Sequence, residues 1–526
     1  IRLMRPRATN AWLLTTVLGI AYLIVAPPSA DLAAQLYRVD LARRSGFTLW
    51  DNAWYAGHHI PGYSILFPPL GAILSAQLVG VLAAVAAAWA FGRIAQAHWG
   101  DDGALGAWWF AAGVSGMLLT GRLTFALGLA FGLVAVRLAQ LDTRAGRIAA
   151  PATAVLATLA SPIAGLFLAM GAGTWLLVDR ERRGDAAVLL AAALVPALVL
   201  AAAFPEGGVE PFHGMSYWPA LAVLLVLVAV LPPRERLLRA LVVVYALACT
   251  ASFLIDTPMG NNVTRLGALF AGPVLAGALW PRRRLLVAVC SIPLLYWQFL
   301  APVHDWSRTA GDPSVRASFY TGLLTELERR RDSQPPFRVE VPFTRSHWES
   351  RYIAPHLHLA RGWERQLDIA RNDLFYSGPF TAARYHAWLG AHGVRYVAVP
   401  KGVTLDHSAR AEAALVAGGV PYLHRVWADD HWTLYEVRDP QPIAAGGATL
   451  VHLSSDGFTL HAPRPGTTTV VHVHWTPFWE LEQGSGCVEQ APGDWTRVRL
   501  RTAGRAHVGT RFALGRIGAD SPRCTG

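Results

Sequence analysis

The sequence predicts a membrane all-α bundle of about eleven transmembrane helices, followed by an extracytoplasmic α/β unit and a C-terminal β-sandwich. Of the 526 residues, 53% are hydrophobic and only 15% are charged, a composition too apolar for an ordinary soluble protein. The long Ala, Leu and Val runs lie in residues 11–302, whereas the remainder has the charge and histidine content of a soluble protein. From about residue 448 only strand signals remain. We therefore expect three domains, 1–302, 303–447 and 448–526.

Apolar runs mark the expected membrane helices, because a perpendicular span needs about 20 mostly apolar residues. We place them at 11–27, 70–95, 104–120, 125–141, 147–160, 163–178, 186–204, 219–232, 238–255, 265–280 and 285–302. Several runs are shorter than that length, so one adjacent pair could be re-entrant. No convincing cleavage site follows the first run, which we expect to remain as an uncleaved helix.

Arginine is distributed unevenly between the two sides of this bundle. Sixteen arginines flank the spans on the side of the N-terminus, and five lie in the opposite loops: Arg38, Arg43, Arg44, Arg122 and Arg265. Basic residues concentrate on the cytoplasmic side of membrane proteins. We therefore expect a multi-pass protein of the cytoplasmic membrane with a cytoplasmic N-terminus and an extracytoplasmic C-terminal part. Most of the net charge of +11 is then explained by the arginines that set the orientation in the membrane, and nucleic acid is not an expected partner.

The first outer loop, Asp31–Pro69, holds the densest group of polar and aromatic residues. Within it, Asp31–Ser45 has the spacing of an amphipathic helix that lies on a membrane surface, with Arg38, Arg43 and Arg44 on the polar face. The following run, Trp50–Pro69, is aromatic and punctuated by Gly and Pro, and it contains Asp51, Tyr55, His58 and His59. A carboxylate at the end of a span, before a surface helix, suits the entrance of an active site. The alternative is that Asp31 only caps the helix.

The other polar loops fall on the same predicted side. They comprise the turn with Arg122, the loop Pro205–Trp218 with His213, and the loop Asp256–Arg265 with Asn261. Polar residues that gather beside a membrane bundle usually line a site. Arg122 and Arg265 could hold a phosphate by charge-assisted hydrogen bonds. The alternative for both is an interfacial anchor whose charge reaches the membrane surface.

The part after the bundle has the patterns of a small α/β unit. We expect helices at Leu323–Arg331, Thr381–Gly393 and Ser408–Ala417, and strands at Phe337–Val341, Arg395–Pro400 and Trp432–Val437. Two His-x-His pairs, at His356 and His472, have no third ligand placed by spacing, so we interpret them as sheet-face residues and not as a metal site. Cys487 and Cys524 both lie in the part placed outside, where a disulfide can persist, and we expect them to pair.

This pattern resembles the GT-C class of membrane glycosyltransferases, and within it bacterial members that use polyprenyl-phosphate sugars, such as actinobacterial arabinosyl- and mannosyltransferases. The resemblance is carried by Asp31 after the first span, by the surface helix, and by the run WDNAWYAGHHIPGY that follows it. It covers the architecture of residues 1–302 well and the C-terminal part loosely. The adjacent acidic pair of many members is missing here. The resemblance implies a GT-C-like bundle and inverting transfer of a sugar to a cell-envelope glycan or lipid acceptor.

Such a transfer needs a carboxylate base and cationic groups for the departing lipid phosphate. Asp31, with Asp51 second, is the expected base, and Arg265, Arg122 and His58 or His59 are the expected phosphate ligands. Tyr55, Asn261 and His213 are expected to line the cavity. Because the leaving group carries a single phosphate, the scheme requires neither metal nor cofactor. Two other classes stay open: a non-catalytic envelope scaffold, and a lipid or glycan transporter, although internal repeats and charged mid-membrane helices typical of transporters are not evident.

Overall fold

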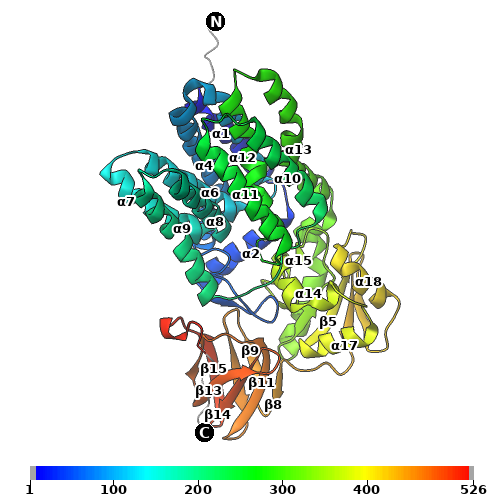
Figure 1. Cartoon of the computed structure of the whole chain (residues 1–526). Helices are drawn as coiled ribbons and strands as arrows, with labels where there is room; N and C mark the ends of the chain where they lie inside the picture. The colour runs from blue at the N-terminus through cyan, green and yellow to red at the C-terminus, as the bar shows by residue number, and fades with distance from the viewer. Residues whose placement is uncertain (1–6, 520–526) are drawn as a thin grey trace. The chain divides into compact units, whose positions relative to one another are not determined.

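The computed structural model describes residues 7–519, and they form two compact units (Figure 1). The helical unit comprises the residues up to Gln35 together with Gly62–Ala201 and Gly207–Ala310. The mixed unit comprises Leu36–Pro61, Ala202–Glu206 and the described residues from Gly311 onward. Part of the first loop therefore belongs to the same unit as the C-terminal half of the chain.

Each of the eleven apolar runs coincides with a helix. These helices are α1 (Trp12–Val25), α4 (Ala76–Trp99), α5 (Ala104–Leu118), α6 (Leu123–Gln140), α7 (Arg144–Ala160), α8 (Pro162–Val178), α9 (Arg183–Ala203), α10 (Gly214–Val230), α11 (Arg236–Leu254), α12 (Thr264–Leu279) and α13 (Arg284–Thr309). A short helix, α3 (Phe67–Leu74), precedes α4. The apolar runs formed helices because, in a membrane, a helix satisfies every backbone hydrogen bond within its own segment.

The helical unit has the surface of a multi-pass membrane protein. Among residues 7–519, seven helical stretches are long and apolar enough to cross a membrane, and α8 and α10 are shorter apolar helices. Large apolar side chains such as Val188, Leu247 and Ile292 are exposed on them, which suits contact with lipid. A helix of 17 residues is about 25 Å long, less than a typical hydrocarbon core, so the number of crossings stays a prediction.

Small residues and one amide hold the bundle together. Gly106 of α5 lies so close to α12 that a Cβ would collide with the carbonyl oxygen of Pro273. Between α5 and α13, the Trp109 indole donates to Gln298 at 2.6 Å, and Gln298 donates to the Leu269 carbonyl at 3.4 Å. Close backbone approach and interhelical hydrogen bonds replace the hydrophobic effect as the source of helix association in lipid.

The predicted surface helix is present as α2 (Ala30–Ser45), and its polar face differs from expectation. Arg43 and Arg44 are exposed. Arg38, which the amphipathic pattern placed on the solvent face, is 2% exposed and pairs with Glu364 at 2.7 Å. The expectation of a polar face open to water is therefore wrong at Arg38, because a carboxylate distant in sequence compensates its buried charge.

The mixed unit begins with an α/β arrangement around a five-stranded sheet of order β4-β3-β5-β7-β6. Its strands are β3 (Arg338–Glu340), β4 (His358–Leu359), β5 (Val394–Pro400), β6 (Leu423–Ala428) and β7 (Trp432–Val437). Strands β3, β4 and β5 are parallel, whereas β7 pairs antiparallel with both β5 and β6. The helices α14 (Thr321–Ser333), α17 (Ala382–Ala391) and α18 (Arg410–Ala417) match the predicted ones within a few residues.

The C-terminal region is rich in strands, as predicted. One sheet has the order β12-β15-β10-β9 and the other β13-β14-β11-β8. Their strands are β8 (Ala444–Gly446), β9 (Thr449–Leu453), β10 (Gly457–Ala462), β11 (Thr467–His474), β12 (Trp479–Gln483), β13 (Gly486–Ala491), β14 (Trp495–Leu500) and β15 (Gly504–Thr510). Phe458 and Leu460 of one sheet share a hydrophobic core with Val471 and Val498 of the other. Cys487 is disulfide-bonded, and Cys524, its expected partner, lies outside the described residues.

Candidate functional site

Asp31 and Arg122, which lie far apart in the sequence, form an ion pair in the helical unit. Asp31 is in the first turn of α2, and Arg122 immediately precedes α6. The Arg122 Nε donates to the Asp31 Oδ2 at 3.1 Å. Both side chains keep about a third of their surface exposed, 30% for Arg122 and 32% for Asp31. The pair is therefore ordered and still reachable by a ligand.

A glycine brings these two elements together. Gly121 has a φ of +72°, and a Cβ on it would collide with the backbone nitrogen of Leu32 and the hydroxyl of Ser29. The turn before α6 therefore packs directly on the start of α2. Positive φ and close backbone approach are the two conditions under which glycine is required. The chain thus places Arg122 beside Asp31 through the residue that precedes Arg122.

A second carboxylate, Asp305, lies near the same pair. Asp305 is in the last turns of α13, and its strongest electrostatic neighbours are Asp31 and Arg122. The hydroxyl of Thr309, one turn further on, donates to the Pro28 carbonyl at 2.8 Å, which ties the end of α13 to the segment before α2. Sequence reasoning missed Asp305. Its position, a carboxylate just beyond the last apolar run in the sequence VHDW, was the available signal.

Arg265 completes the group, at the start of α12. Its guanidinium lies over the ring of Phe125, 5.7 Å from the centroid, and it interacts electrostatically with Arg122, Asp31 and Glu210. Within residues 7–519, Arg265 forms no ion pair closer than 4.0 Å, in contrast to Arg122. We name Asp31, Arg122, Arg265, Asp305 and Glu210 the acid–arginine cluster.

The charge state of Arg122 follows from these neighbours. Burial by itself would lower its pKa, but the carboxylates of Asp31 and Asp305 and the hydrogen bond to Asp31 raise the pKa above its ordinary value. A neighbouring anion favours the charged form of a base. Arg122 is therefore a permanent cation, and it shares its positive charge among carboxylates.

Two loops hold Glu210 in place. The Glu210 amide donates to the Thr257 carbonyl at 3.1 Å, and a Cβ on Gly260 would collide with the Glu210 carbonyl oxygen. Asn261 uses its backbone carbonyl to accept the Thr264 hydroxyl at 2.8 Å, which shapes the turn before α12. His213 is exposed at the start of α10. Of the expected cavity residues in this unit, Asn261 thus supports the loop and His213 faces solvent.

A long apolar cavity lies inside the helical unit. Its volume is about 460 Å³, and it is lined by α4, α6, α8, α9, α10, α11 and α12. Phe125, the ring beneath Arg265, also lines this cavity. Along α6 the lining extends from Phe125 to Gln140, which is about 22 Å at the helical rise. Polar residues, Asp179 and Arg182 among them, line its other end.

Asp51 occupies a different setting in the mixed unit. It lies in the strand β1 (Trp50–Asp51), which pairs with β2 (His58–His59). The side chain is fully buried, and it accepts hydrogen bonds from the Tyr37 hydroxyl at 2.8 Å and from the Ala53 amide at 3.0 Å. Burial raises the pKa of Asp51 to about 6. Its carboxylate is therefore committed to the hairpin.

The other first-loop candidates are held in the same unit. Burial lowers the pKa of His58 to about 3, so its imidazole is neutral. His59 Nδ1 lies 2.7 Å from Glu206, which also pairs with Arg371 at 3.0 Å. Burial alone would raise the pKa of Glu206, but Arg371 and His59 lower it to about 2. The Tyr55 hydroxyl accepts the Glu364 amide at 2.8 Å. These contacts secure the loop within the mixed unit.

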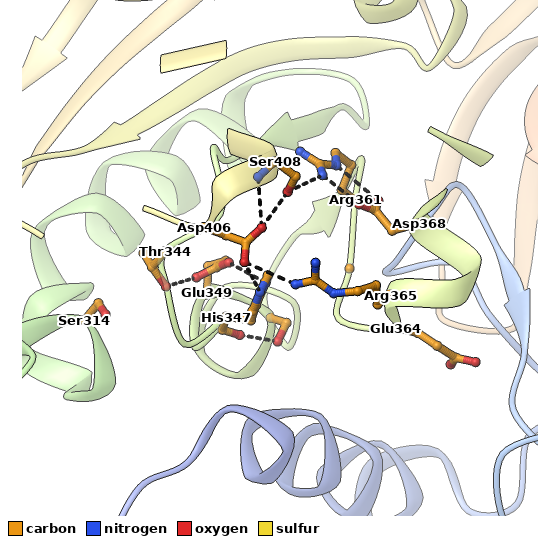
Figure 2. Close-up of polar contacts among 12 residues, drawn as sticks. Ser314, Thr344, His347, Glu349, Arg361, Glu364, Arg365, Asp368, Asp406 and Ser408 are labelled. Atoms are coloured by element: carbon orange, nitrogen blue, oxygen red, sulfur yellow. Dashed lines mark hydrogen bonds and ion pairs between the residues drawn. The ribbon is translucent and has the colours of Figure 1, made fainter. Parts of the chain in front are cut away.

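Figure 2 presents a further polar group of the mixed unit, around His347. Its imidazole lies 3.7 Å from Glu349 on one side and 3.7 Å from Asp406 on the other. Asp406 also accepts hydrogen bonds from the Ser408 hydroxyl at 2.8 Å and from the Arg365 guanidinium at 3.1 Å. His347 and Glu349 are each 1% exposed. Because substrate could not reach them, the group is structural and joins the loops that follow strands β3 and β5.

The described residues do not form a candidate metal site. Within residues 7–519 no three His, Cys, Asp or Glu side chains lie together in a way that could hold a metal ion. Of the histidines in the His-x-His runs, His356 pairs with Glu328 at 2.7 Å and His474 with Asp494 at 3.0 Å.

Comparison with known proteins finds likenesses among solved structures. No family model and no curated protein matches the chain. The fold is similar to the cryo-EM structure of the arabinofuranosyltransferase AftD from Mycobacteria, at 16% identity and a TM-score of 0.48 over 87% of this chain. Two classes of a mutant of that protein match at 17% and 13% identity, each with a TM-score of 0.47, over 84% and 97% of this chain. The chain spans 41%, 42% and 60% of the three AftD chains, less than two thirds of each.

Proposed function

We propose that this protein is a membrane glycosyltransferase that moves a sugar from a polyprenyl-phosphate donor to a glycan or lipid acceptor. One observation carries the proposal: Arg265, an arginine without an ion pair in the described chain, lies beside a long apolar cavity and near the Asp31–Arg122 pair. A lipid phosphate needs both a cationic end and an apolar channel, and this unit offers both together.

The donor would bind with its phosphate at Arg265 and Arg122 and its isoprenoid chain in the cavity. A guanidinium presents several N–H donors in a planar fork that suits phosphate oxygens. The cavity lining contains aromatic and aliphatic side chains over most of its length, which suits a hydrocarbon chain. Binding of the phosphate at Arg122 would draw that arginine away from Asp31 and release the carboxylate.

Asp31 would then act as the general base. The acceptor hydroxyl oxygen forms a bond to the anomeric carbon of the donor, and Asp31 takes the hydroxyl proton. The bond from that carbon to the phosphate oxygen breaks, and the polyprenyl phosphate leaves with the electron pair, which the arginines stabilise. Attack opposite the leaving group inverts the anomeric carbon. The partial exposure of Asp31 supports it over Asp51, which is fully buried.

In this proposal the bundle crosses the cytoplasmic membrane eleven times. The excess of arginines on the N-terminal side supports a cytoplasmic N-terminus. The acid–arginine cluster, the α/β region and the two terminal sheets, packed as a β-sandwich, would then lie outside. Protease accessibility in intact cells tests the orientation. Cleavage of residues beyond Gly311 only after the inner membrane is permeabilised would contradict it.

The activity test uses the full chain in detergent or nanodiscs with radiolabelled polyprenyl-phosphate sugars. Loss of a general base typically lowers the rate by about 10²–10⁴-fold, so we expect Asp31→Asn to lose turnover while donor binding stays. The control is Asp142→Asn, an exposed carboxylate elsewhere in the unit. Full activity of Asp31→Asn with loss in Asp51→Asn would transfer the role to Asp51. Full activity in both variants, or no transfer by the native chain, would contradict the proposal.

A further inference from the structure

The mixed unit contains an open polar groove that no step of the proposed transfer uses. Its volume is about 500 Å³, within the range of small-ligand sites. It is lined by side chains of α2 and α14, by Arg351 and Tyr352 of α15 (Glu349–Tyr352), and by Ala317, Pro355 and His356 outside these helices. Helices α14 and α15 are labelled in Figure 1.

One face of α14 provides a continuous wall of this groove. Thr321, Leu324, Thr325 and Glu328 follow the i, i+3, i+4, i+7 spacing that places side chains on one side of a helix. The two threonines are exposed and Leu324 and Glu328 are half-buried. The wall therefore alternates hydroxyl, aliphatic and carboxylate groups within one strip.

Two pairs of acidic and basic side chains lie in the groove, and Arg44 also approaches Asp40, at 3.5 Å. His356 lies 2.7 Å from Glu328, and Arg351 lies 3.4 Å from Asp40. All four side chains keep between 26% and 45% of their surface exposed. Carboxylates, guanidinium and imidazole each have more hydrogen-bonding positions than one partner uses. The groove can thus donate and accept many hydrogen bonds.

The apolar part of the lining suits the carbon face of a sugar. Tyr352 is half-buried and its ring packs on Trp348 and Tyr320, at centroid distances of 5.6 and 5.0 Å. With Leu324 and Pro355 it gives a rigid apolar surface beside the polar groups. Aromatic side chains that have one apolar face and a polar edge are well suited to such amphipathic ligands.

We propose that this groove binds the neutral sugar residues of a glycan chain, and that this glycan is the acceptor. The second half of the statement rests on the proposed function. A glycan matches these features: many hydroxyls for the paired acid and base groups and an apolar ring face for Tyr352. Asp40 of the groove and Asp31 of the acid–arginine cluster belong to the same helix, α2.

The experiment separates glycan binding from transfer. Binding of neutral oligosaccharides is measured by isothermal titration with the full chain. Thr325→Trp fills the groove from an exposed position, so folding is preserved. The control is Asp332→Asn, an exposed residue on the same helix outside the groove. We expect at least tenfold weaker binding of neutral oligosaccharides for Thr325→Trp and native binding for the control.

Transfer kinetics supply the second readout. For Thr325→Trp we expect KM for a glycan acceptor to rise at least tenfold, while kcat and hydrolysis of the donor stay as in the native chain. Native binding by Thr325→Trp, or no binding of neutral oligosaccharides by the native chain, would overturn the groove as a glycan site. A third outcome is that Thr325→Trp loses glycan binding while the native chain shows no transfer. This outcome would support the groove as a glycan site and overturn both its acceptor role and the proposed function.

Discussion

Asp31 accepts a hydrogen bond from Arg122 at 3.1 Å across 91 residues of sequence, and Gly121 makes this pair possible. No side chain larger than hydrogen fits at residue 121, because the start of α2 occupies the space. The relationship joins a candidate base to a candidate phosphate ligand.

Gly121→Ala should separate Asp31 from Arg122. The φ of +72° is unfavourable for alanine, by about 1–2 kcal/mol, and the new methyl group would displace the backbone of Leu32. We expect activity at least tenfold lower and a melting temperature lower by a few degrees, measured by transfer assay and thermal unfolding. The matched control is Gly173→Ala in α8, where a Cβ would meet only Leu190, at 4.0 Å. Native activity of Gly121→Ala would show that the pair does not depend on this turn.

Asp305→Asn should strengthen binding of a lipid phosphate. Asp305 is a negative charge near Arg122, so its removal leaves more positive potential for an anion. We expect affinity for polyprenyl phosphate to rise about two- to fivefold, or ~0.5–1 kcal/mol, as is usual for partly exposed charges. Arg265→Gln should lower the same affinity. Weaker binding by Asp305→Asn would instead indicate that this carboxylate orients the arginines.

Gly171→Phe should fill the apolar cavity. Gly171 lines the cavity, and no atom of a neighbouring element lies within 4 Å of the position that a Cβ would take there, so the added ring enters empty space. We expect KM to rise for donors with long isoprenoid chains and to change little for donors with short chains. The control is Leu177→Phe on the same helix, where the side chain is 71% exposed. Equal KM changes for long and short chains would argue against the cavity as the chain site.

Glu349→Gln should reduce the loss of stability at alkaline pH. Burial raises the pKa of Glu349 from 4.5 to about 8. The folded chain therefore holds a proton that the unfolded chain releases above pH 4.5. The stability that this proton contributes is complete below pH 4.5 and is lost as the pH rises through about 8. The substituted glutamine stays neutral and can still accept the Thr344 hydroxyl, whose bond to Glu349 measures 2.5 Å.

Thermal unfolding of the full chain at pH 6 and pH 9 measures this effect. Between pH 6 and pH 9 the melting temperature of the native chain should fall further than that of the Glu349→Gln variant. Asp406, whose pKa is held well below its ordinary range by His347 and Arg365 against the effect of burial, is ionised at both values and does not contribute to the difference. The exposed Asp332→Asn variant serves as the control. An unchanged pH dependence in Glu349→Gln would show that Glu349 titrates at its ordinary pKa.

Local sequence determined the elements of this protein. The apolar runs became helices α1 and α4 to α13, and the strand patterns Arg395–Pro400 and Trp432–Val437 became β5 and β7. These outcomes follow from side-chain polarity and backbone propensity within a few turns of chain. The same reasoning selected Asp31, Arg122 and Arg265, because charged residues at the ends of apolar runs are conspicuous in the sequence.

Asp51, His58 and His59 illustrate what polarity alone does not predict. In the sequence they resemble Asp31, since each is an ionisable residue in the first loop. In the structure the Tyr37 hydroxyl donates to Asp51, Glu206 pairs with His59, and His58 is buried and neutral. Glu206 and its own partner Arg371 come from segments more than a hundred residues away. Whether an ionisable group is committed to structure depends on such partners, which no local pattern specifies.

The sequence by itself determined which segments are apolar, where the helices and strands lie, and which charged residues stand at the ends of the spans, because each of these follows from nearby residues. Only the tertiary structure decided that Asp305 lies near Asp31, that Arg265 stands beside an apolar cavity, and that Arg38 is buried against Glu364. Those facts depend on how helices far apart in the sequence pack, and packing is set by the mutual fit of residues such as Gly121 and Leu32.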